Sequence, residues 1–348
     1  MIVKVGIIGC GAITSHRHGP EYANNKECNI VTFCDPSVDR AKQMAKLYGG
    51  NYYDNYKYIL ENPEINAVSI CSSNDTHAKI TIEALKAGKH VLCEKPMAIN
   101  SKEAKEMIRA ANESNKFLMI GHNQRLISAH KKVKEILERG DMGKVITFRT
   151  SFKHTGPESW SADKSKNIWF YRKAAAFFGV LGDLGIHKID LIQWLLGQQI
   201  IEVSATIGTL NKRSSNGNMI EVEDNAIAMF KTSGGILGTM EVSWTNYGIE
   251  DNSTVIYCEN GVIKIANDPK YDVVLEMNGG ESIYYKTAGI STNTNQLTSG
   301  IIDSFIYSII NNTKPDISGE EGYKSLVVIE ACIESSNKKK WITIDHNI

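Results

Sequence analysis

The chain contains 348 residues, of which 42% are hydrophobic and 22% are charged, and its formal net charge is zero. A chain of this length exceeds one ordinary hydrophobic core, so we expect two domains. The balanced charge argues against a nucleic-acid partner, which needs a basic face. Because no run approaches the roughly 20 apolar residues of a membrane span, we expect no membrane partner.

Seven cysteines are scattered along the chain, an odd number, and none of them forms a C-x-x-C pair. Cys34, Cys71 and Cys93 lie in apolar segments, where a buried thiol behaves as a small hydrophobic side chain. The first residues enter a predicted strand directly, without the basic leader and cleavage site of a signal peptide. We therefore expect a reducing, cytoplasmic location.

The first third of the chain alternates predicted strands with predicted helices. The predicted strands are residues 2–8, 29–34, a short segment from Tyr52, 67–71, 91–93 and 117–120. The predicted helices are residues 12–24, 37–48, a short segment ending before Pro63, 74–87 and 101–114. Short loops between alternating strands and helices indicate a parallel, doubly wound α/β sheet.

After Arg125, runs of adjacent strands replace this alternation. The predicted strands are residues 144–152, 200–209, 221–232, 235–246, 253–258, 261–266 and a short one near the end. Helices are predicted up to residue 139 and over 182–196, 296–311 and 319–336. Consecutive strands joined by hairpin turns indicate a large, mostly antiparallel open sheet in an α+β domain. We place the boundary near Gln124, which gives domains 1–124 and 125–348.

The predicted strand around residue 228 is apolar on both faces. Ala226, Ala228 and Phe230 point one way, and Ile227 and Met229 point the other. A sheet that is apolar on both faces needs two covers. Helices can supply one cover, and a second subunit is our hypothesis for the other.

A glycine-rich turn stands between the first strand and the first helix. Gly9-x-Gly11 has the position of a phosphate-binding turn, with Thr14 in place of the usual third glycine. Asp35 ends the second strand about 20 residues further on, where a carboxylate binds the adenosine ribose and repels a 2′-phosphate. The pattern predicts an NAD site and disfavours NADP. An ordinary strand–helix turn and a turn aspartate before Pro36 are the alternatives.

The strand over residues 91–93 ends in Glu94-Lys95-Pro96, where the proline stops the ladder of hydrogen bonds. This places Lys95 at the carboxyl end of a strand, the edge at which open α/β sheets bind ligands. The lysine is either a solvated surface charge or a cation that acts on a ligand.

Asp183 and His187 are four residues apart on a predicted helix and therefore share one face. Such a pair can grip neighbouring hydroxyls of a polyol, and the pKa of histidine suits proton transfer near neutrality. The same helix carries many apolar residues, so a capping pair or a core histidine is the alternative. Asp190, three residues after His187, fits a structural role.

Four segments resemble those of the Gfo/Idh/MocA family, named after glucose–fructose oxidoreductase and inositol dehydrogenase, and the resemblance covers nearly the whole chain. The segments are residues 9–13 (GCGAI), 74–77 (NDTH), 87–96 (AGKHVLCEKP) and 182–190 (GDLGIHKID). Ser73 replaces the proline that usually precedes the second segment. The resemblance implies a Rossmann domain followed by an open-sheet α/β domain. It also implies NAD(P)-dependent redox of sugars or cyclitols at the seam of the two domains, in homodimers or homotetramers.

The resemblance also implies a role for each residue at the predicted ligand edge. Lys95 becomes the catalytic lysine, which hydrogen-bonds the reacting oxygen and stabilises developing charge. His187 becomes the base, and Asp183 orients the sugar or the imidazole. Replacing Lys95 by alanine is expected to lower kcat far more than NAD affinity. Oxidation is expected to accelerate between pH 6 and 9 as His187 loses its proton.

The nucleotide and the substrate are each assigned a set of residues by this resemblance and by the motifs. The cofactor-binding set is Gly9, Gly11, Ala12, Ile13, Asp35, Arg40, Ser72, Asn74, His77, Glu94 and Lys95. The substrate-binding set is Lys95, Arg125, Trp169, Asp183 and His187.

Several members of these sets have strong structural alternatives. Asn74 and His77 are expected near the nicotinamide, although a helix cap and a helix histidine would explain them nearly as well. Arg125 is either a substrate contact or a brace at the domain seam. Trp169 lies in a polar, aromatic loop over residues 154–175 whose rings suit a sugar.

Two further patterns carry little functional signal. Trp244 fits the core of its strand as well as a sugar site. His16 and His18 do not converge from i, i+2 positions on a helix, so we expect no metal.

The leading hypothesis is an NAD-dependent dehydrogenase that acts on a sugar or cyclitol hydroxyl. Some members of the family retain NAD and hydrolyse glycosides by transient oxidation, elimination and re-reduction. Others are non-catalytic NAD-sensing regulators. Release of NADH distinguishes a dehydrogenase from such a hydrolase. The set of Lys95, Asp183 and His187 argues against a regulator, which has no need of proton-transfer groups.

Overall fold

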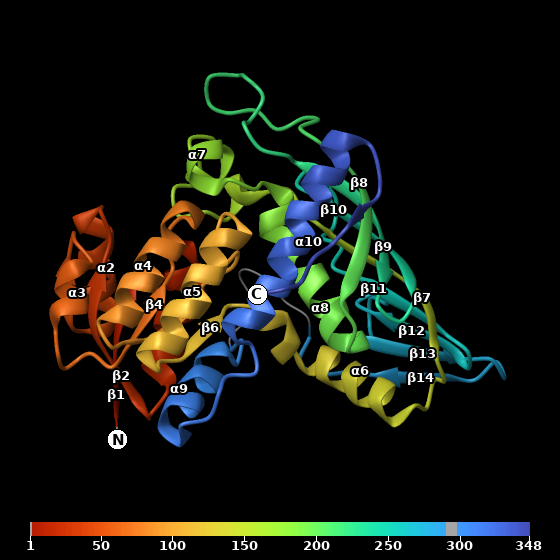
Figure 1. Ribbon diagram of the computed structural model, residues 1–348, viewed down its shortest axis with the longest axis horizontal. Helices are drawn as coiled ribbons and strands as arrows, with labels where there is room; N and C mark the ends of the chain where they lie inside the picture. The colour runs from red at the N-terminus through yellow and green to blue at the C-terminus, as the bar shows by residue number, and fades with distance from the viewer. Residues whose placement is uncertain (1, 290–297) are drawn as a thin grey trace.

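A computed structural model describes residues 2–289 and 298–348 of the chain (Figure 1). Its first sheet is parallel and has six strands in the order β3-β2-β1-β4-β5-β6. The strands are β1 (Val3–Ile8), β2 (Cys28–Cys34), β3 (Asn51–Tyr53), β4 (Ala67–Ile70), β5 (His90–Cys93) and β6 (Leu118–Ile120). The strand order reverses direction between β1 and β4, and this is the point at which doubly wound sheets bind ligands. The predicted Rossmann architecture is confirmed.

Helices lie on both faces of this sheet. They are α1 (Gly19–Asn24), α2 (Val38–Tyr48), α3 (Lys57–Glu61), α4 (Asn74–Lys86) and α5 (Ser101–Ser114). The helix predicted over residues 12–24 is not uniform, because Thr14–His18 forms a π-helical turn ahead of α1. Such turns often occur at functional sites. Here the turn buries His18 against Glu94 at the end of β5.

The second sheet has nine strands in the order β14-β13-β12-β11-β7-β10-β9-β8-β15. They are β7 (Val145–Lys153), β8 (Ile200–Gly208), β9 (Asn225–Thr232), β10 (Leu237–Ser243), β11 (Thr254–Cys258), β12 (Gly261–Ile265), β13 (Val273–Met277), β14 (Ser282–Tyr285) and β15 (Ile342–Thr343). The β7–β10 pair is parallel and the other pairs are antiparallel. The predicted mostly antiparallel sheet is confirmed, although β13 and β14 were not foreseen.

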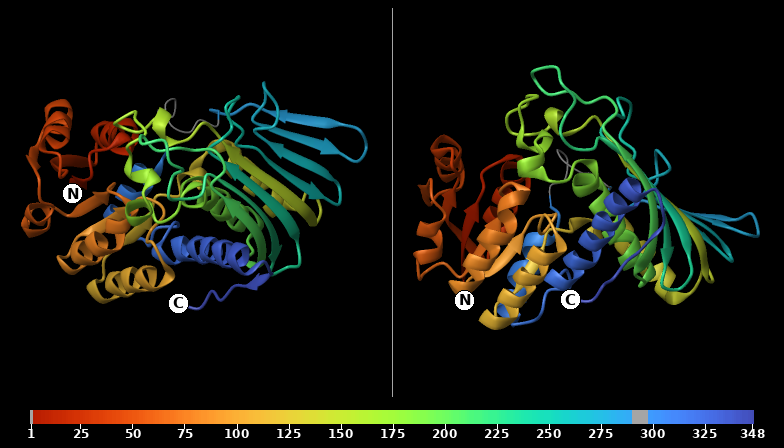
Figure 2. Two further views of the ribbon diagram at one scale, coloured as in Figure 1. Left: turned by 90° about the horizontal axis from the view of Figure 1, so that it is seen from above. Right: turned by 45° about the horizontal axis from the view of Figure 1, so that its top comes forward.

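One face of the second sheet is covered by helices and the other is open. Figures 1 and 2 show α6 (Ser128–Arg139), α8 (Ile186–Leu196) and α10 (Gly319–Lys338) on the covered side. On the opposite face Ile146, Ile227, Met229 and Leu237 are 48–58% exposed. No helix within the described ranges is long and apolar enough to cross a membrane.

The C-terminal segment returns to the first sheet. Helix α9 (Ile301–Asn311) packs against α1 and β1, and α10 packs against α5 and β6 (Figure 1). The backbone N–H of Ile120 donates to Ile317 O at 2.9 Å, which joins this segment to the edge of the sheet. Of the helix predicted over residues 296–311, the first two residues lie outside the described ranges and the helix begins at Ile301. The predicted division at 124/125 thus falls between β6 and β7, whereas α9 and part of α10 lie against the first sheet.

Candidate active site

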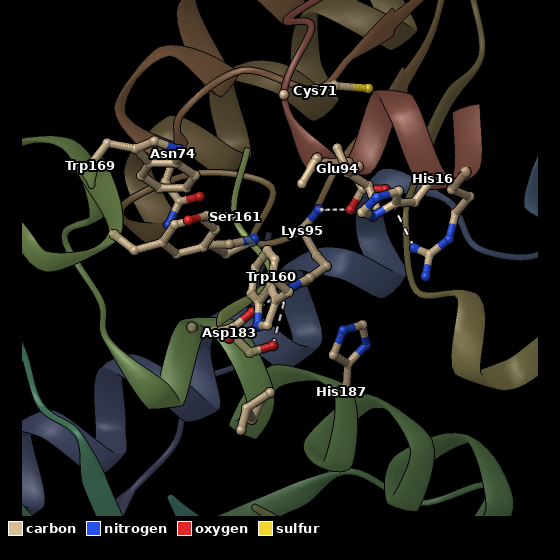
Figure 3. Close-up of a pocket in the computed structure, with 18 of the residues that line it drawn as sticks. His16, Cys71, Asn74, Glu94, Lys95, Trp160, Ser161, Trp169, Asp183 and His187 are labelled. Carbon is tan, nitrogen blue, oxygen red and sulfur yellow. Dashed lines mark hydrogen bonds and ion pairs between the residues drawn. The ribbon is translucent and has the colours of Figure 1, made fainter. Parts of the chain in front are cut away.

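A cavity lies at the carboxyl edge of the first sheet, where the loop after β7 and the start of α8 meet it (Figure 3). Most of the residues predicted from the sequence line it: Gly11, Ala12, Ile13, Arg40, Ser72, Asn74, His77, Glu94, Lys95, Trp169, Asp183 and His187. Gly9, Asp35 and Arg125 are not among the lining residues. The cavity therefore joins the predicted nucleotide turn to the predicted catalytic groups.

The glycine turn has the form that a pyrophosphate needs. Gly9 has a φ of +97°, and a Cβ added there would lie 2.5 Å from the carbonyl carbon and oxygen of Cys71. A Cβ added at Gly11 would meet no atom within 4 Å, so the backbone there is open for close approach. Thr14, which stands in place of the third glycine, donates its hydroxyl to Gly9 O at 2.6 Å. These features fit NAD, whose phosphates would lie against Gly11 and the helix that follows.

Asp35 supports the glycine turn with both of its carboxylate oxygens. Its Oδ2 accepts the N–H of Cys10 and its Oδ1 accepts the N–H of Ser37, each at 2.8 Å. Each carboxylate oxygen keeps a second lone pair. The neighbouring Arg40 donates to Asp163 Oδ1 at 2.5 Å, which ties α2 to the loop after β7. Sequence reasoning did not anticipate Asp163.

Lys95 and Asp183 bring the two parts of the chain together. Lys95 Nζ donates to Asp183 Oδ1 at 2.9 Å and to Asp183 O at 3.0 Å. The fully buried Trp244 donates its Nε1 hydrogen to Asp183 Oδ2 at 3.1 Å. Both carboxylate oxygens are thus held in place, and Lys95 is directed across the cavity (Figure 3). Alternation along the predicted strand over residues 235–246 left Trp244 open between the core and a sugar site, and it gave no sign of this bond.

Glu94 is anchored on the side away from Asp183. It lies 2.9 Å from His18 Nε2 and 3.8 Å from Arg17, and it accepts the N–H of Lys95 at 3.2 Å. Burial alone would raise the pKa of Glu94, but the hydrogen bond to His18 and the charges of Arg17 and Lys95 lower it to about 2. Glu94 is therefore ionised and fixes the end of β5 from which Lys95 projects.

His187 lies in the first turn of α8 and lines the same cavity. Leu181–Gly185 forms a π-helical turn before α8, so Asp183 and His187 do not lie on one regular α-helix. The Nδ1 atom of His187 is buried without a hydrogen-bond partner among the described atoms. Burial, followed by the charge of Lys95, lowers the pKa of His187 well below its ordinary value of 6.5. The imidazole is accordingly neutral and able to accept a proton.

Asn74 and His77 connect segments around the cavity. Asn74 does not cap α4 with its side chain; its amide donates to Ala176 O at 2.8 Å. His77 lies between Pro96 O at 2.8 Å and Ser72 O at 3.1 Å. Burial lowers the pKa of His77. These contacts hold the loops after β4 and β5 together.

Arg125 is buried and paired with carboxylates. It donates to Asp190 at 2.8 and 2.6 Å and to Glu321 Oε2 at 3.0 Å. Of the two roles left open by the sequence, this geometry supports the brace between segments rather than a substrate contact. Asp190 is its structural partner.

Many lining residues were missing from the sets drawn from the sequence, among them Phe152, His154, Trp160 and Ser161. These four follow β7 or lie in it, far in sequence from the motifs. Buried polar atoms of His154, Trp160 and Ser161 have no hydrogen-bond partner among the described atoms. The aromatic, polar composition of the loop was the available signal for them.

Comparisons with known proteins agree with this geometry. The model of the oxidoreductase family with an NAD-binding Rossmann fold matches residues 3–122, and that of the GFO/IDH/MocA C-terminal domain matches residues 130–264. Levoglucosan dehydrogenase of Pseudarthrobacter phenanthrenivorans is 25% identical over 90% of this chain and 89% of its own. Myo-inositol 2-dehydrogenase of Thermotoga maritima is 25% identical over 99% and 100%.

Solved structures show the same fold. A levoglucosan dehydrogenase in complex with NADH and levoglucosan superposes with a TM-score of 0.88 at 23% identity, over 100% of both chains. A myo-inositol 2-dehydrogenase from Lactobacillus plantarum superposes with a TM-score of 0.83 at 23% identity, over 99% of this chain and 100% of its own. Together, the two matched domain models and the shared fold show that this chain belongs to the Gfo/Idh/MocA family of oxidoreductases with an NAD-binding Rossmann domain.

Proposed function

We propose that the chain oxidises a ring hydroxyl of a sugar or cyclitol with NAD. The observation that carries the proposal is the meeting of Lys95, Asp183 and His187 at the cavity that also contains the glycine turn. The relatives named as levoglucosan and inositol dehydrogenases support this substrate class. The bound nicotinamide would accept the hydride.

Each of the three side chains has a role that its surroundings support. The Lys95 ammonium donates a hydrogen bond to the reacting oxygen and stabilises its developing negative charge. The neutral imidazole of His187 accepts the hydroxyl proton. Asp183, fixed by Trp244, orients Lys95 and keeps its charge compensated inside a low-dielectric cavity.

We propose NAD rather than NADP as the cofactor. Asp35 would bind the ribose hydroxyls through its remaining lone pairs, and its charge repels a 2′-phosphate. Arg40, the nearby cation that a 2′-phosphate could use, is paired with Asp163.

The test is a panel of sugars and polyols incubated with NAD or NADP and followed by absorbance of the reduced nicotinamide. We expect NADH formation with at least one neutral ring polyol and a weaker response with NADP. Sugar release from a glycoside without net NADH would instead favour the hydrolase. Binding of NADH with no turnover of any ring substrate would favour a regulator.

We also propose that two copies associate through the open face of the second sheet. Ile146, Ile227, Met229 and Leu237 form an exposed apolar patch across β7, β9 and β10. An exposed apolar patch on the uncovered face of a sheet favours association with a second copy of the chain. Sedimentation should show a dimer or tetramer, and Ile227→Lys should yield monomers. A monomeric parent chain would contradict the proposal.

A cytoplasmic location is proposed on the basis of the cysteines. All seven are buried and free. Burial raises the pKa of several of these thiols, for example that of Cys34 to about 12, so they stay protonated and unreactive. Fractionation of the native host should find the chain with cytoplasmic markers.

A further inference from the structure

Trp160 and Ser161, in the loop after β7, each carry a buried polar group that has no hydrogen-bond partner among the described atoms. Ser161 is 6% exposed, and its Oγ has no hydrogen-bond partner among the described atoms. The Nε1 hydrogen of Trp160 is also buried and without such a partner. Both residues line the cavity, as do Asp183 and Lys95 (Figure 3).

Leaving such groups unpaired destabilises the folded chain. A buried donor or acceptor without a partner costs about 1–3 kcal/mol. Native structures keep few of them, and those that persist commonly face a ligand or water. Two unpaired groups on adjacent residues, in the cavity that also contains Lys95, Asp183 and His187, therefore point to hydroxyls of the substrate.

The surrounding rings hold Trp160 in place and present an apolar wall. Trp160 packs edge-on against Phe170 at 5.1 Å between ring centroids, and Phe170 stacks on Trp169 at 3.8 Å. Glu158 bonds Lys212 and Tyr171, which anchors the start and end of the same loop. A wall of this kind suits the C–H face of a six-membered polyhydroxy ring.

The charges around the cavity are balanced. Among the described lining residues, Arg17, Arg40 and Lys95 are cations, and Glu94, Asp163 and Asp183 are anions. Each cation lies beside one of these carboxylates, at 3.8, 2.5 and 2.9 Å respectively. Recognition of a phosphate or carboxylate on a substrate relies on a cation that is not already compensated. This lining favours a substrate without such a group.

We propose that Trp160 Nε1 and Ser161 Oγ bind hydroxyls of an uncharged, unphosphorylated ring substrate and so determine its specificity. The inference rests on the proposed dehydrogenase function and narrows its substrate to neutral rings. It also distinguishes this chain from a relative of Bacillus subtilis named glucose-6-phosphate 3-dehydrogenase, which is 30% identical over 64% of this chain.

The first test compares matched substrates. Glucose, methyl glucoside, levoglucosan and myo-inositol are assayed with NAD beside glucose 6-phosphate and gluconate. We expect kcat/KM for the best neutral ring to exceed that for every charged compound by at least about ten-fold. Turnover preferring a charged compound would overturn the inference while leaving the proposed function intact. Turnover of none of them, with NADH bound, would overturn both.

The second test uses the full-length chain with Trp160→Phe, which keeps the ring and removes the N–H, and with Ser161→Ala. Each should raise KM for the best neutral ring about ten-fold, with a smaller change in kcat and an NADH dissociation constant within about two-fold of the parent.

Ser165→Ala is the matched control in the same loop. Ser165 Oγ accepts the N–H of Asn167, and Ser165 is not a lining residue. It should leave KM unchanged. An unchanged KM in both test variants, or a parallel loss of NADH binding, would show that Trp160 and Ser161 serve the loop rather than the substrate.

Discussion

Lys95 and Asp183 are joined twice, once through the carboxylate and once through the backbone carbonyl of Asp183, although 88 residues separate them. Removing the ammonium should leave the glycine turn intact and abolish charge stabilisation at the reacting oxygen. We expect Lys95→Met to lower kcat by about 10²- to 10⁴-fold. Steady-state kinetics gives kcat, and NADH fluorescence gives nucleotide affinity.

The nucleotide affinity of the Lys95→Met chain is the internal control. It should stay within about three-fold of the parent value, because the glycine turn and Asp35 are held by their own hydrogen bonds, none of which involves Lys95. A loss of NADH binding as large as the loss of kcat would mean that Lys95 acts structurally.

Trp244 positions Asp183 from inside the core. Trp244→Phe keeps most of the buried ring and removes the donor to Asp183 Oδ2. The expected result is a roughly ten-fold lower kcat with little change in NADH affinity, since one buried hydrogen bond is lost. Trp341→Phe, at a 47% exposed tryptophan, is the control. Equal effects of the two substitutions on kcat would argue against the positioning role.

The environment of His187 changes the expected pH dependence. Because burial lowers the pKa of His187 well below 6.5, the imidazole is neutral at neutral pH, and the proton loss that the sequence led us to expect between pH 6 and 9 shifts into the acidic range. The rate of oxidation should rise with pH in the acidic range and show no His187-dependent rise at or above neutral pH. His187→Gln should remove the acidic limb and lower kcat about 100-fold. A limb between pH 6 and 9 that vanishes in this variant would contradict the structure.

Asp163 should contribute to the choice between NAD and NADP. Asp163→Asn removes the charge that occupies Arg40 and frees the guanidinium for a 2′-phosphate. Because the ion pair is partly exposed, we expect a modest three- to five-fold tighter NADPH binding with NADH little changed. Asp39→Asn, an exposed acidic residue beside Arg40 in sequence, controls for general surface charge. The same shift in both variants would rule out a specific role for the ion pair.

Lys188 should make stability depend on pH. It is fully buried, donates to Asn252 O at 3.0 Å, and burial lowers its pKa from 10.5 to about 7. Between pH 7 and 10.5, Lys188 is protonated more fully in the unfolded chain than in the folded chain. The contribution of Lys188 to the free energy of unfolding therefore rises with pH, by at most about 1.4 kcal/mol per pH unit. Urea denaturation from pH 7 to 10 should show a shallower rise in Lys188→Met. Parallel curves would contradict this.

Strong local signals explain why the first sheet could be predicted. Its strands are apolar runs bounded by glycine, proline and helix caps, so each element is visible in its own sequence. β13 and β14 were missed because each is a run of four or five residues that depends on pairing with β12 and with each other. Their strand conformation is a product of tertiary context.

In the candidate site, too, residues in local sequence patterns could be predicted, whereas contacts that depend on the tertiary fold could not. Lys95, Asp183 and His187 lie in recognisable local patterns, and all three line one cavity. The bonds from Trp244 to Asp183 and from Arg40 to Asp163 join residues 61 and 123 positions apart. No local spacing encodes such pairs. The pairing of Arg125 with Asp190 and Glu321 likewise depends on the fold.

Helix α10 connects the two sheets and contacts one of them at each end. A Cβ added at Gly319, near its beginning, would lie 2.9 Å from Leu118 in β6, and Ser335, near its end, accepts the N–H of Ala205 in β8 at 3.0 Å. A hinge motion that separates the two sheets would break the contact at one end of α10, either with β6 or with β8. We therefore expect the nucleotide to enter and leave by displacement of the loop that contains Asp163, so that the rate of NADH release depends on this loop.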